Sequence, residues 1–265
     1  MTEEILKKIK QLPPLPESAM QIEAVYQDPD STFNDMVKIL EKDPLLTADI
    51  LKAANSPLYG FSREINTINQ AVGLFGMGTV RGFALASIVK KSFALDLSVY
   101  GITNDMFSAL SKKQHALVTS WCLRKESRLL GVLSPAAFLV EIGKVLIAQQ
   151  IIADKTEKKF KEALATCGSV EEAEREVTGV DTPEVSASVF EHWRFESGLV
   201  ETIRYCTEPQ RAKEDMQKAA KILQVVRTAV PINGVITEQS VTAAKELILK
   251  YNLDIESFEK ALETI

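Results

Sequence analysis

Histidine and cysteine are the side chains of this sequence best suited to catalysis or metal binding, and both are scarce. The chain contains two histidines, His115 and His192, and three widely spaced cysteines that form no Cys-x-x-Cys pair. Neither a thiolate zinc site nor a disulfide framework is therefore expected. A lone histidine is more often packed or hydrogen-bonded than catalytic. The sequence also lacks a Gly-x-Ser-x-Gly nucleophile motif and a Gly-rich phosphate loop, so the chemistries that depend on these motifs are not expected.

The stretch Asp43–Gly60 is the most clearly patterned part of the chain. Asp43 can cap free backbone N–H groups, and Pro44 suits the first helical position because its missing N–H is not needed there. A broad apolar face follows, which predicts a buried helix. The side chains expected in the core are Leu46, Ile50 or Leu51.

Asn55 and Ser56 stand at the end of this helix, directly before Pro57, which disfavours helix at the preceding residue. Such side chains commonly hydrogen-bond to nearby backbone, so we expect both to cap the helix. The alternative is that they form a polar corner that binds a ligand or a partner.

Helix signals recur along the whole chain, whereas no convincing strand alternation does. The sequence therefore predicts an all-α fold. Capping residues and capping boxes mark the predicted helix starts. These starts lie at Thr32, Thr67, Asp154, Ser169, Thr182, Ser197, Lys213, Thr237 and Asp254.

Glycine and proline divide the middle of the chain. Gly76 is placed to end the helix that begins after Thr67, and the other glycines of 73–82 favour close helix contacts. Ser134 and Pro135 are predicted to start a helix that runs to about residue 153, with the serine as its cap.

Composition and charge narrow the class of protein. The chain has 265 residues, 46% of them hydrophobic and 25% charged, which is ordinary for a soluble globular protein. Its net charge of −5, with scattered Lys and Arg, argues against general nucleic-acid binding. The N-terminus has no signal-peptide pattern, and the apolar run Leu129–Val140 is too short to span a membrane. We expect a soluble, cytoplasmic protein without membrane insertion.

Three segments in order resemble one known family. Leu12–Ile22, Asp43–Gly60 and Ile65–Leu85 are together similar to the HDOD domain, the HD-related output domain of bacterial signalling proteins. The resemblance is strongest from Leu12 to Pro209. It implies a multi-helix bundle related to the metal-dependent HD phosphohydrolases. The expected organisation is a single HDOD-like unit, 1–265, with an N-terminal helical lobe (1–103), a degenerate HD-like core (104–210) and a C-terminal helical extension (211–265).

The resemblance also places the positions at which HD enzymes bind their metal. Those enzymes use histidines and aspartates to hold a metal that polarises phosphate and generates hydroxide. Here His115 matches the first histidine, and Gly143 and Lys144 match the end of a His-Asp-x-Gly-Lys stretch. Other residue types stand at the remaining matched positions, which are Val140, Glu141, Thr182, Cys206 and Thr207. The resemblance therefore implies no catalytic metal, no cofactor and no enzymatic activity.

The favoured function is a non-catalytic signal-transduction or regulatory module that binds an as yet unidentified signalling protein or small ligand. One alternative is a residual metal-dependent phosphohydrolase, supported by His115 and Glu141. Another is a nucleotide or cyclic-dinucleotide sensor, in which Lys144, Arg204 and Lys112 would bind phosphates if they face the vestigial pocket.

Overall fold

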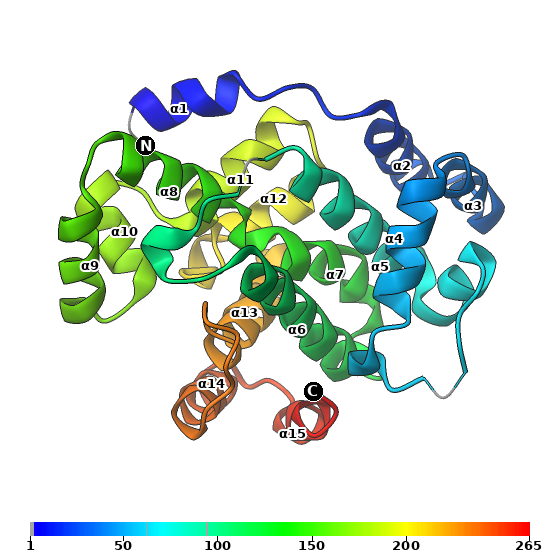
Figure 1. Ribbon diagram of the computed structural model, residues 1–265. Helices are drawn as coiled ribbons and strands as arrows, with labels where there is room; N and C mark the ends of the chain where they lie inside the picture. Colours follow the sequence, from blue (N-terminus) through cyan, green and yellow to red (C-terminus); the bar gives the residue numbers. More distant parts are fainter. Residues whose placement is uncertain (1–2, 62, 94) are drawn as a thin grey trace.

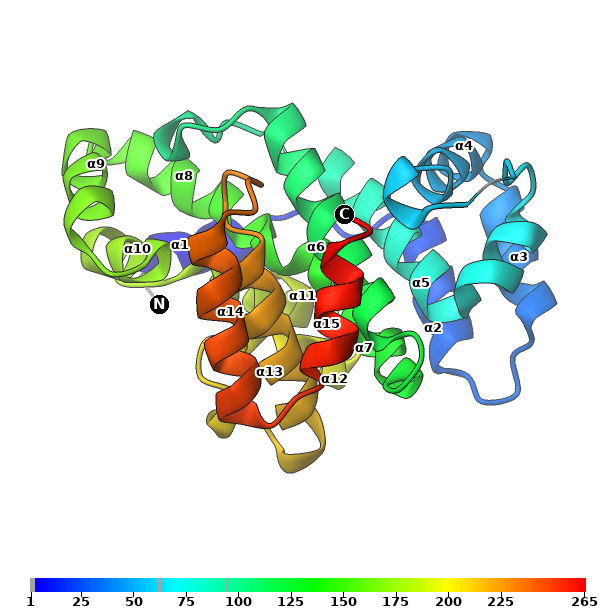
Figure 2. The ribbon, with the colours of Figure 1, turned by 90° about the horizontal axis from the view of Figure 1, so that it is seen from below.

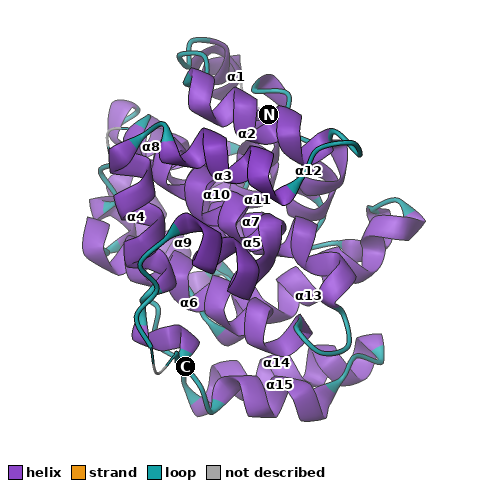
Figure 3. Ribbon diagram, turned by 90° about the vertical axis from the view of Figure 1, so that its right-hand side faces the viewer, coloured by secondary structure: helices purple, strands orange, loops and turns teal. Residues whose placement is uncertain are grey.

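The computed structural model describes residues 3–61, 63–93 and 95–265, and every regular element in those ranges is helical (Figure 3). The predicted all-α class is confirmed. The N-terminal helices are α1 (Glu3–Lys10), α2 (Glu17–Gln27), α3 (Phe33–Glu41), α4 (Pro44–Ala54) and α5 (Ile68–Lys91).

The remaining α-helices form the centre and the C-terminal part of the molecule. They are α6 (Asn104–Cys122), α7 (Leu130–Leu139), α8 (Gly143–Ala153), α9 (Glu157–Thr166), α10 (Val170–Thr178), α11 (Thr182–His192), α12 (Ser197–Arg204), α13 (Glu214–Ala229), α14 (Glu238–Tyr251) and α15 (Ile255–Leu262). Short 3-10 turns lie at Pro57–Tyr59, Ser98–Tyr100, Ser127–Leu129, Val140–Ile142 and Pro209–Arg211.

Helices α2 to α5 gather at one end of the molecule and α8 to α10 at the other, with α6, α7, α11 and α12 between them (Figures 1 and 2). The C-terminal helices α13 to α15 form a third group beside α6. Helix α1 packs against α8 and α11, far from α2. The N-terminal lobe predicted over 1–103 thus includes one helix that lies on the core.

Local sequence signals at the N-terminal helices act as predicted. The Asp43 carboxylate accepts hydrogen bonds from the backbone N–H groups of Leu45 and Leu46, both at 3.0 Å. Thr67 and Gln70 form a reciprocal capping box at the start of α5. Gly76 has φ of +79° within α5 and divides it by a kink, because glycine adopts positive φ without steric cost.

Two glycines after this kink allow α5 to pack closely on α7. A Cβ built on Gly78 would lie 2.8 Å from the Cα of Gly131, and one built on Gly82 would lie 2.9 Å from Ser134 Oγ. Both distances are too short for carbon contacts, so only glycine fits at either position. The predicted close helix contact is thus confirmed at Gly78 and Gly82, whereas a Cβ built on Gly73 would have no neighbouring atom within 4 Å.

The predicted helix start at Ser134 is wrong. Helix α7 begins at Leu130 and contains Pro135 in its interior. Proline lacks the N–H that would bond to the carbonyl of Gly131, four residues earlier. Arg81 Nη1 donates a hydrogen bond to that carbonyl instead, at 3.3 Å. The helix also does not run on to residue 153, because the turn Val140–Ile142 separates α7 from α8.

The predicted cap at Asp154 is also wrong. Thr156 is the N-cap residue of α9, without a side-chain cap bond. The Asp154 carboxylate instead accepts a hydrogen bond from Gln150 Nε2 at 2.7 Å. The spacing of Asp154 and Glu157 resembles a capping box, but the Asp154 carboxylate is hydrogen-bonded to the preceding helix α8.

One continuous core extends from Ile5 to Ala261. Within α4, Leu46 and Ile50 are buried as predicted, whereas Leu51 is only half-buried and is corrected here to a position at the edge of the core. The stretches Ile68–Lys91 and Ser127–Ala153 are long and apolar enough to cross a membrane by composition, but 56% and 89% of their most apolar windows are buried within the fold. More than half of each window therefore packs inside the fold.

Candidate functional site

His115 lies on the inward face of α6 and is fully buried. Its Nδ1 shares a hydrogen bond with the Tyr59 hydroxyl (2.5 Å), and its Nε2 shares one with Ser134 Oγ (2.8 Å). The ring stacks on Phe138 with centroids 4.0 Å apart. Burial lowers the pKa of this imidazole to about 3, so the ring is neutral near pH 7. Both ring nitrogens are occupied by protein hydroxyls.

Glu141 lies elsewhere, on the turn between α7 and α8, and is also buried. Its carboxylate binds Arg227 Nε at 2.8 Å and Lys144 Nζ at 3.3 Å. From α6 it accepts a hydrogen bond from Gln114 Nε2 at 3.3 Å. Gln114, and not its neighbour His115, is therefore the α6 residue that faces Glu141. Burial alone would raise the pKa of this carboxyl, but the charges of Arg227 and Lys144 outweigh burial and hold the pKa below its usual value.

Lys144 lies in the first turn of α8 and is buried among polar partners. Its ammonium group lies 3.0 Å from a Glu174 oxygen and donates to Thr182 Oγ1 at 3.0 Å. Burial would lower the pKa of Lys144, but the negative charges of Glu174 and Glu141 raise it above its ordinary value. The lysine therefore remains charged, and its ammonium group is already paired with Glu141 and Glu174.

Arg227 on α13 joins the same network from the C-terminal extension. Besides Glu141 it binds Glu171 Oε1 at 2.6 Å, and its Nη1 donates to Cys206 Sγ at 3.7 Å. Burial would lower the pKa of the guanidinium, but the two glutamates raise it well above its ordinary value. Two cations and three carboxylates thus form one buried ion-pair network, made of Glu141, Lys144, Glu171, Glu174 and Arg227.

Other positions matched to metal-binding histidines also surround this network. Cys206 is buried, which raises the pKa of its thiol to about 12, so the sulfur is protonated near pH 7. Thr207 lines a cavity of about 580 Å³ beside Glu141 and Arg227. Val140 points into the core, and its carbonyl accepts a hydrogen bond from Ser186 Oγ at 2.6 Å. Among the predicted vestigial positions, the side chains of His115 and Val140 lie apart from the network.

This set of donors is a poor match to a divalent metal ion. Metals of HD enzymes need imidazole and carboxylate ligands that converge. The donors around Glu141 are a carboxylate already bound by two cations, a neutral thiol, and hydroxyl groups. Within the described ranges, no group of three or more His, Cys, Asp or Glu side chains could hold a metal.

The remaining candidate residues lie at separate places. The Asn55 amide donates to the carbonyls of Leu51 (2.9 Å) and Ile65 (2.8 Å) and accepts from the Ile65 N–H (2.8 Å). Ser56 precedes the turn Pro57–Tyr59 and makes no side-chain cap bond there. Asn55 therefore joins the end of α4 to the segment before α5, using its whole amide.

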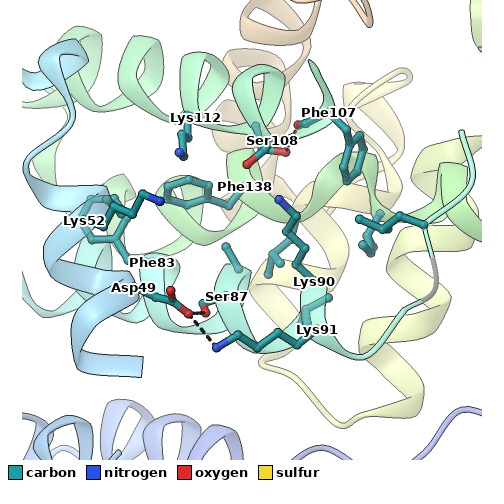
Figure 4. Close-up of a pocket in the computed structure, with 17 residues that line it drawn as sticks. Asp49, Lys52, Phe83, Ser87, Lys90, Lys91, Phe107, Ser108, Lys112 and Phe138 are labelled. Atoms are coloured by element: carbon teal, nitrogen blue, oxygen red, sulfur yellow. Dashed lines mark hydrogen bonds and ion pairs between the residues drawn. The ribbon is translucent and has the colours of Figure 1, made fainter. Parts of the chain in front are cut away.

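The three basic residues considered for phosphate binding do not converge. Lys144 is inside the ion-pair network, and Arg204 pairs with Glu191 at 2.5 Å on the α11–α12 surface. Lys112 lies on α6 at the rim of a different cavity (Figure 4). A phosphate site built from all three is contradicted by this placement.

Sequence reasoning missed Arg227, Gln114, Glu171 and Glu174. Arg227 follows the apolar pair Val225 and Val226 in a helix whose inward face is otherwise apolar. A charged residue on the inward face of a helix indicates a buried ion pair, because an unpaired buried charge is too costly. Gln114 gave no such signal, since it stands next to the more conspicuous histidine.

The family model of the HDOD domain matches residues 12–209 of this chain. An uncharacterized protein of Treponema pallidum (strain Nichols) is 30% identical over 73 residues, which are 28% of this chain and only 14% of that protein. The matched stretch is thus a small part of that relative.

Two solved structures share the fold across nearly the whole chain. A candidate phosphohydrolase from Shewanella amazonensis SB2B has a TM-score of 0.75 at 24% identity, covering 99% of this chain and 94% of that one. A candidate signal transduction protein from Marinobacter aquaeolei VT8 has a TM-score of 0.71 at 20% identity, covering 100% of this chain and 59% of that one. At these identities the likeness concerns the fold, and it confirms the predicted HD-like bundle.

Proposed function

This chain belongs to the HDOD domain family, and we propose that it is a non-catalytic signal-transduction module that acts by binding a protein partner or a small ligand. We place it in the bacterial cytoplasm, where signalling domains of this kind meet their partners. Neither a metal nor a cofactor takes part in the proposed function.

The observation that carries the proposal is the pairing of Glu141 with two side-chain cations. Arg227 and Lys144 bind the carboxylate that stands at the matched aspartate position. A divalent ion there would have to displace a buried guanidinium or add two charges beside it. Like charges repel strongly at low dielectric, so either route is unfavourable.

Metal binding and phosphodiester hydrolysis test the non-catalytic part directly. The purified protein is incubated with Mn²⁺, Fe²⁺ or Mg²⁺ and dialysed. Bound metal is then measured by mass spectrometry, and hydrolysis of bis-p-nitrophenyl phosphate is followed in parallel. We expect no stoichiometric metal, and a rate of hydrolysis no higher than that of the Glu141→Gln variant. Stoichiometric metal that is lost in Glu141→Gln, together with hydrolysis, would instead support the residual phosphohydrolase.

Ligand binding is tested by thermal unfolding with a panel of nucleotides, cyclic dinucleotides and aromatic acids. A ligand that binds the folded state raises its apparent stability by mass action. We expect a ligand to raise the unfolding temperature by the same amount in wild type and in Glu141→Gln, because the buried network is already satisfied. A cyclic dinucleotide whose effect is lost in that variant would favour a sensor that uses the vestigial pocket.

A further inference from the structure

A second cavity lies where the N-terminal helices meet the core, away from the ion-pair network (Figure 4). It has a volume of about 460 Å³ and is bordered by α4, α5, α6 and α7. This volume is within the usual range of small-molecule sites, roughly 300–1,000 Å³. The cavity is therefore large enough for an organic ligand and lies between two groups of helices.

Three aromatic side chains contribute to the apolar lining of this cavity, together with aliphatic ones. Phe83 from α5, Phe107 from α6 and Phe138 from α7 line it. Phe83 and Phe138 meet edge to face with centroids 5.4 Å apart, and His115 stacks behind Phe138. Aromatic rings favour this offset or edge-to-face contact with other rings, so the lining suits a ligand with an aromatic body.

Three lysines surround this aromatic lining. The amino groups of Lys52, Lys90 and Lys112 lie around the Phe138 ring in Figure 4. No ion pair joins them to a carboxylate in the described part of the chain. The cavity's aspartate, Asp49, is already bound by Lys91 at 2.7 Å and by Ser87 Oγ at 2.6 Å.

The positive charge of this cluster is only partly compensated by nearby carboxylates. Burial lowers the pKa of Lys90, and the positive charge of Lys112 lowers it further, while Asp105 and Asp49 offset this only in part. The whole chain carries a net charge of −5, so an unpaired basic cluster stands out from its surroundings. A bound anion would relieve the repulsion between the lysines.

We propose that this cavity binds an organic anion with an aromatic body, whose rings pack on Phe83, Phe107 and Phe138 and whose charge lies among Lys52, Lys90 and Lys112. Nucleotides and aromatic carboxylates share this chemistry. The proposal rests on the proposed function, in which this anion is the signal. Because the lining comes from the N-terminal helices α4 and α5 and from the core helices α6 and α7, a bound ligand would contact both.

The test uses two fluorescent probes of the same shape on the full chain. Anilinonaphthalene sulfonate carries a negative charge, and phenylnaphthylamine is its uncharged counterpart. We expect Lys112→Glu and Lys52→Glu each to weaken binding of the sulfonate by about tenfold, while binding of the neutral probe stays nearly unchanged. Lys161→Glu on α9 is the matched control, because it alters net charge equally at an exposed position far from the cavity.

Variants that fill the cavity test the role of its shape independently of its charge. Ser108→Trp on α6 should abolish binding of both probes, and Ala53→Phe on α4 should do the same from the other side. Circular dichroism and urea unfolding establish that each variant is folded. The proposal is overturned if Lys112→Glu and Lys161→Glu weaken the sulfonate equally, or if folded, filled variants bind both probes like wild type.

Competition then distinguishes the two sources of the anion. ATP and GTP represent nucleotides, and indole-3-acetate represents aromatic carboxylates. Displacement of the sulfonate by either class supports the proposal and identifies the source, whereas displacement by neither overturns it. The metal and hydrolysis assays above do not involve this cavity. Probe binding therefore tests the anion site, and those assays test the non-catalytic assignment, so either proposal can fail without the other.

Discussion

Arg227 is the single residue on which the buried polar site most depends. Its guanidinium contacts Glu141, Glu171 and Cys206, which lie on three different segments of the chain. The side chain is only 10% exposed, so its contacts with these partners are largely shielded from solvent. A buried ion pair that loses one partner leaves an uncompensated charge, which costs more than the pair itself contributes.

Replacing this arginine should therefore destabilise the fold strongly. We expect Arg227→Met to lower the free energy of unfolding by about 3–5 kcal/mol, measured by urea denaturation at pH 7. Arg204→Met is the matched control, because Arg204 pairs with the largely exposed Glu191 and should cost about 1 kcal/mol or less. Equal losses in the two variants would contradict the importance assigned to the buried network.

His115 should make stability depend on pH. Its pKa is about 3 in the folded state against 6.5 in the unfolded state, so below pH 6.5 the unfolded chain binds the extra proton. Stability should fall as pH falls from about 6.5 towards about 3, by at most roughly 1.4 kcal/mol per pH unit from this group. We expect His115→Gln to flatten the slope of unfolding free energy between pH 6.5 and 5.

The exposed His192 supplies the control for this measurement. His192→Gln makes the same substitution at an exposed position, so it controls for the change of side chain itself. A slope that persists in His115→Gln would show that another group titrates in this range. Most carboxylates titrate at lower pH. Burial raises the pKa of Glu174, so the comparison with His115→Gln, and not the pH interval alone, isolates the contribution of His115.

At the scale of elements, α4 shows how one helix divides its residues between core and surface. Leu46 and Ile50 are 1% and 0% exposed, whereas Leu45 is 73% exposed. Leu51 lies between these extremes. The apolar pattern alone suggests that all four are equivalent, but the helix packs against α5 and α3 on one side only.

Truncation along this helix should follow the exposure gradient. We expect Ile50→Ala to cost about 2–5 kcal/mol of unfolding free energy, because it leaves a cavity in the core. Leu51→Ala should cost less, and Leu45→Ala should have little effect. Thermal and urea unfolding of the three variants provide the test. A Leu45→Ala loss as large as that of Ile50→Ala would place α4 in a different orientation.

Asn55 is the residue that joins α4 to the segment leading into α5. Its amide makes three backbone hydrogen bonds, so Asn55→Ala should lower stability by about 1–3 kcal/mol. Ser56→Ala, at a neighbouring position without a cap bond, should change it by less than about 0.5 kcal/mol. Binding of anilinonaphthalene sulfonate should be unaffected in both variants. Lost binding at unchanged stability would instead assign Asn55 to recognition.

At the scale of the whole molecule, Arg81 connects the N-terminal helices to the core. This fully buried side chain on α5 binds Glu23 on α2 through two bonds of 2.6 and 2.7 Å. It also binds Glu196, directly before α12, at 3.1 Å, and its guanidinium lies 4.1 Å from the centre of the Tyr26 ring. The guanidinium also binds the carbonyl of Gly131 in α7, so it joins three separate segments to α5.

Removing this connection should weaken the whole chain and not one lobe alone. We expect Arg81→Met to cost about 3–5 kcal/mol, because Glu23 would remain buried without its partner. Far-ultraviolet and near-ultraviolet circular dichroism should still report one coincident transition, since the core is continuous. Adding Glu23→Gln to Arg81→Met should recover part of the loss. Two separated transitions in wild type would contradict the single unit predicted over 1–265.

Local sequence determined much of the fold, because capping and turn signals are satisfied within a few residues. The Asp43 cap, the Thr67–Gln70 box and the kink at Gly76 follow from side chains that bond to nearby backbone or from glycine's freedom at positive φ. The same local reading identified the HDOD family, which the family model over residues 12–209 confirms.

Only the tertiary structure decided which side chains share a site. Glu141 meets Arg227, which lies 86 residues later in the chain, whereas His115 faces Tyr59 and Ser134 and is kept from Glu141 by the orientation of α6. The inclusion of Pro135 inside α7 likewise depends on Arg81, from a distant helix. Such contacts follow from how helices pack and bury charge, and neither spacing nor propensity along the chain contains that information.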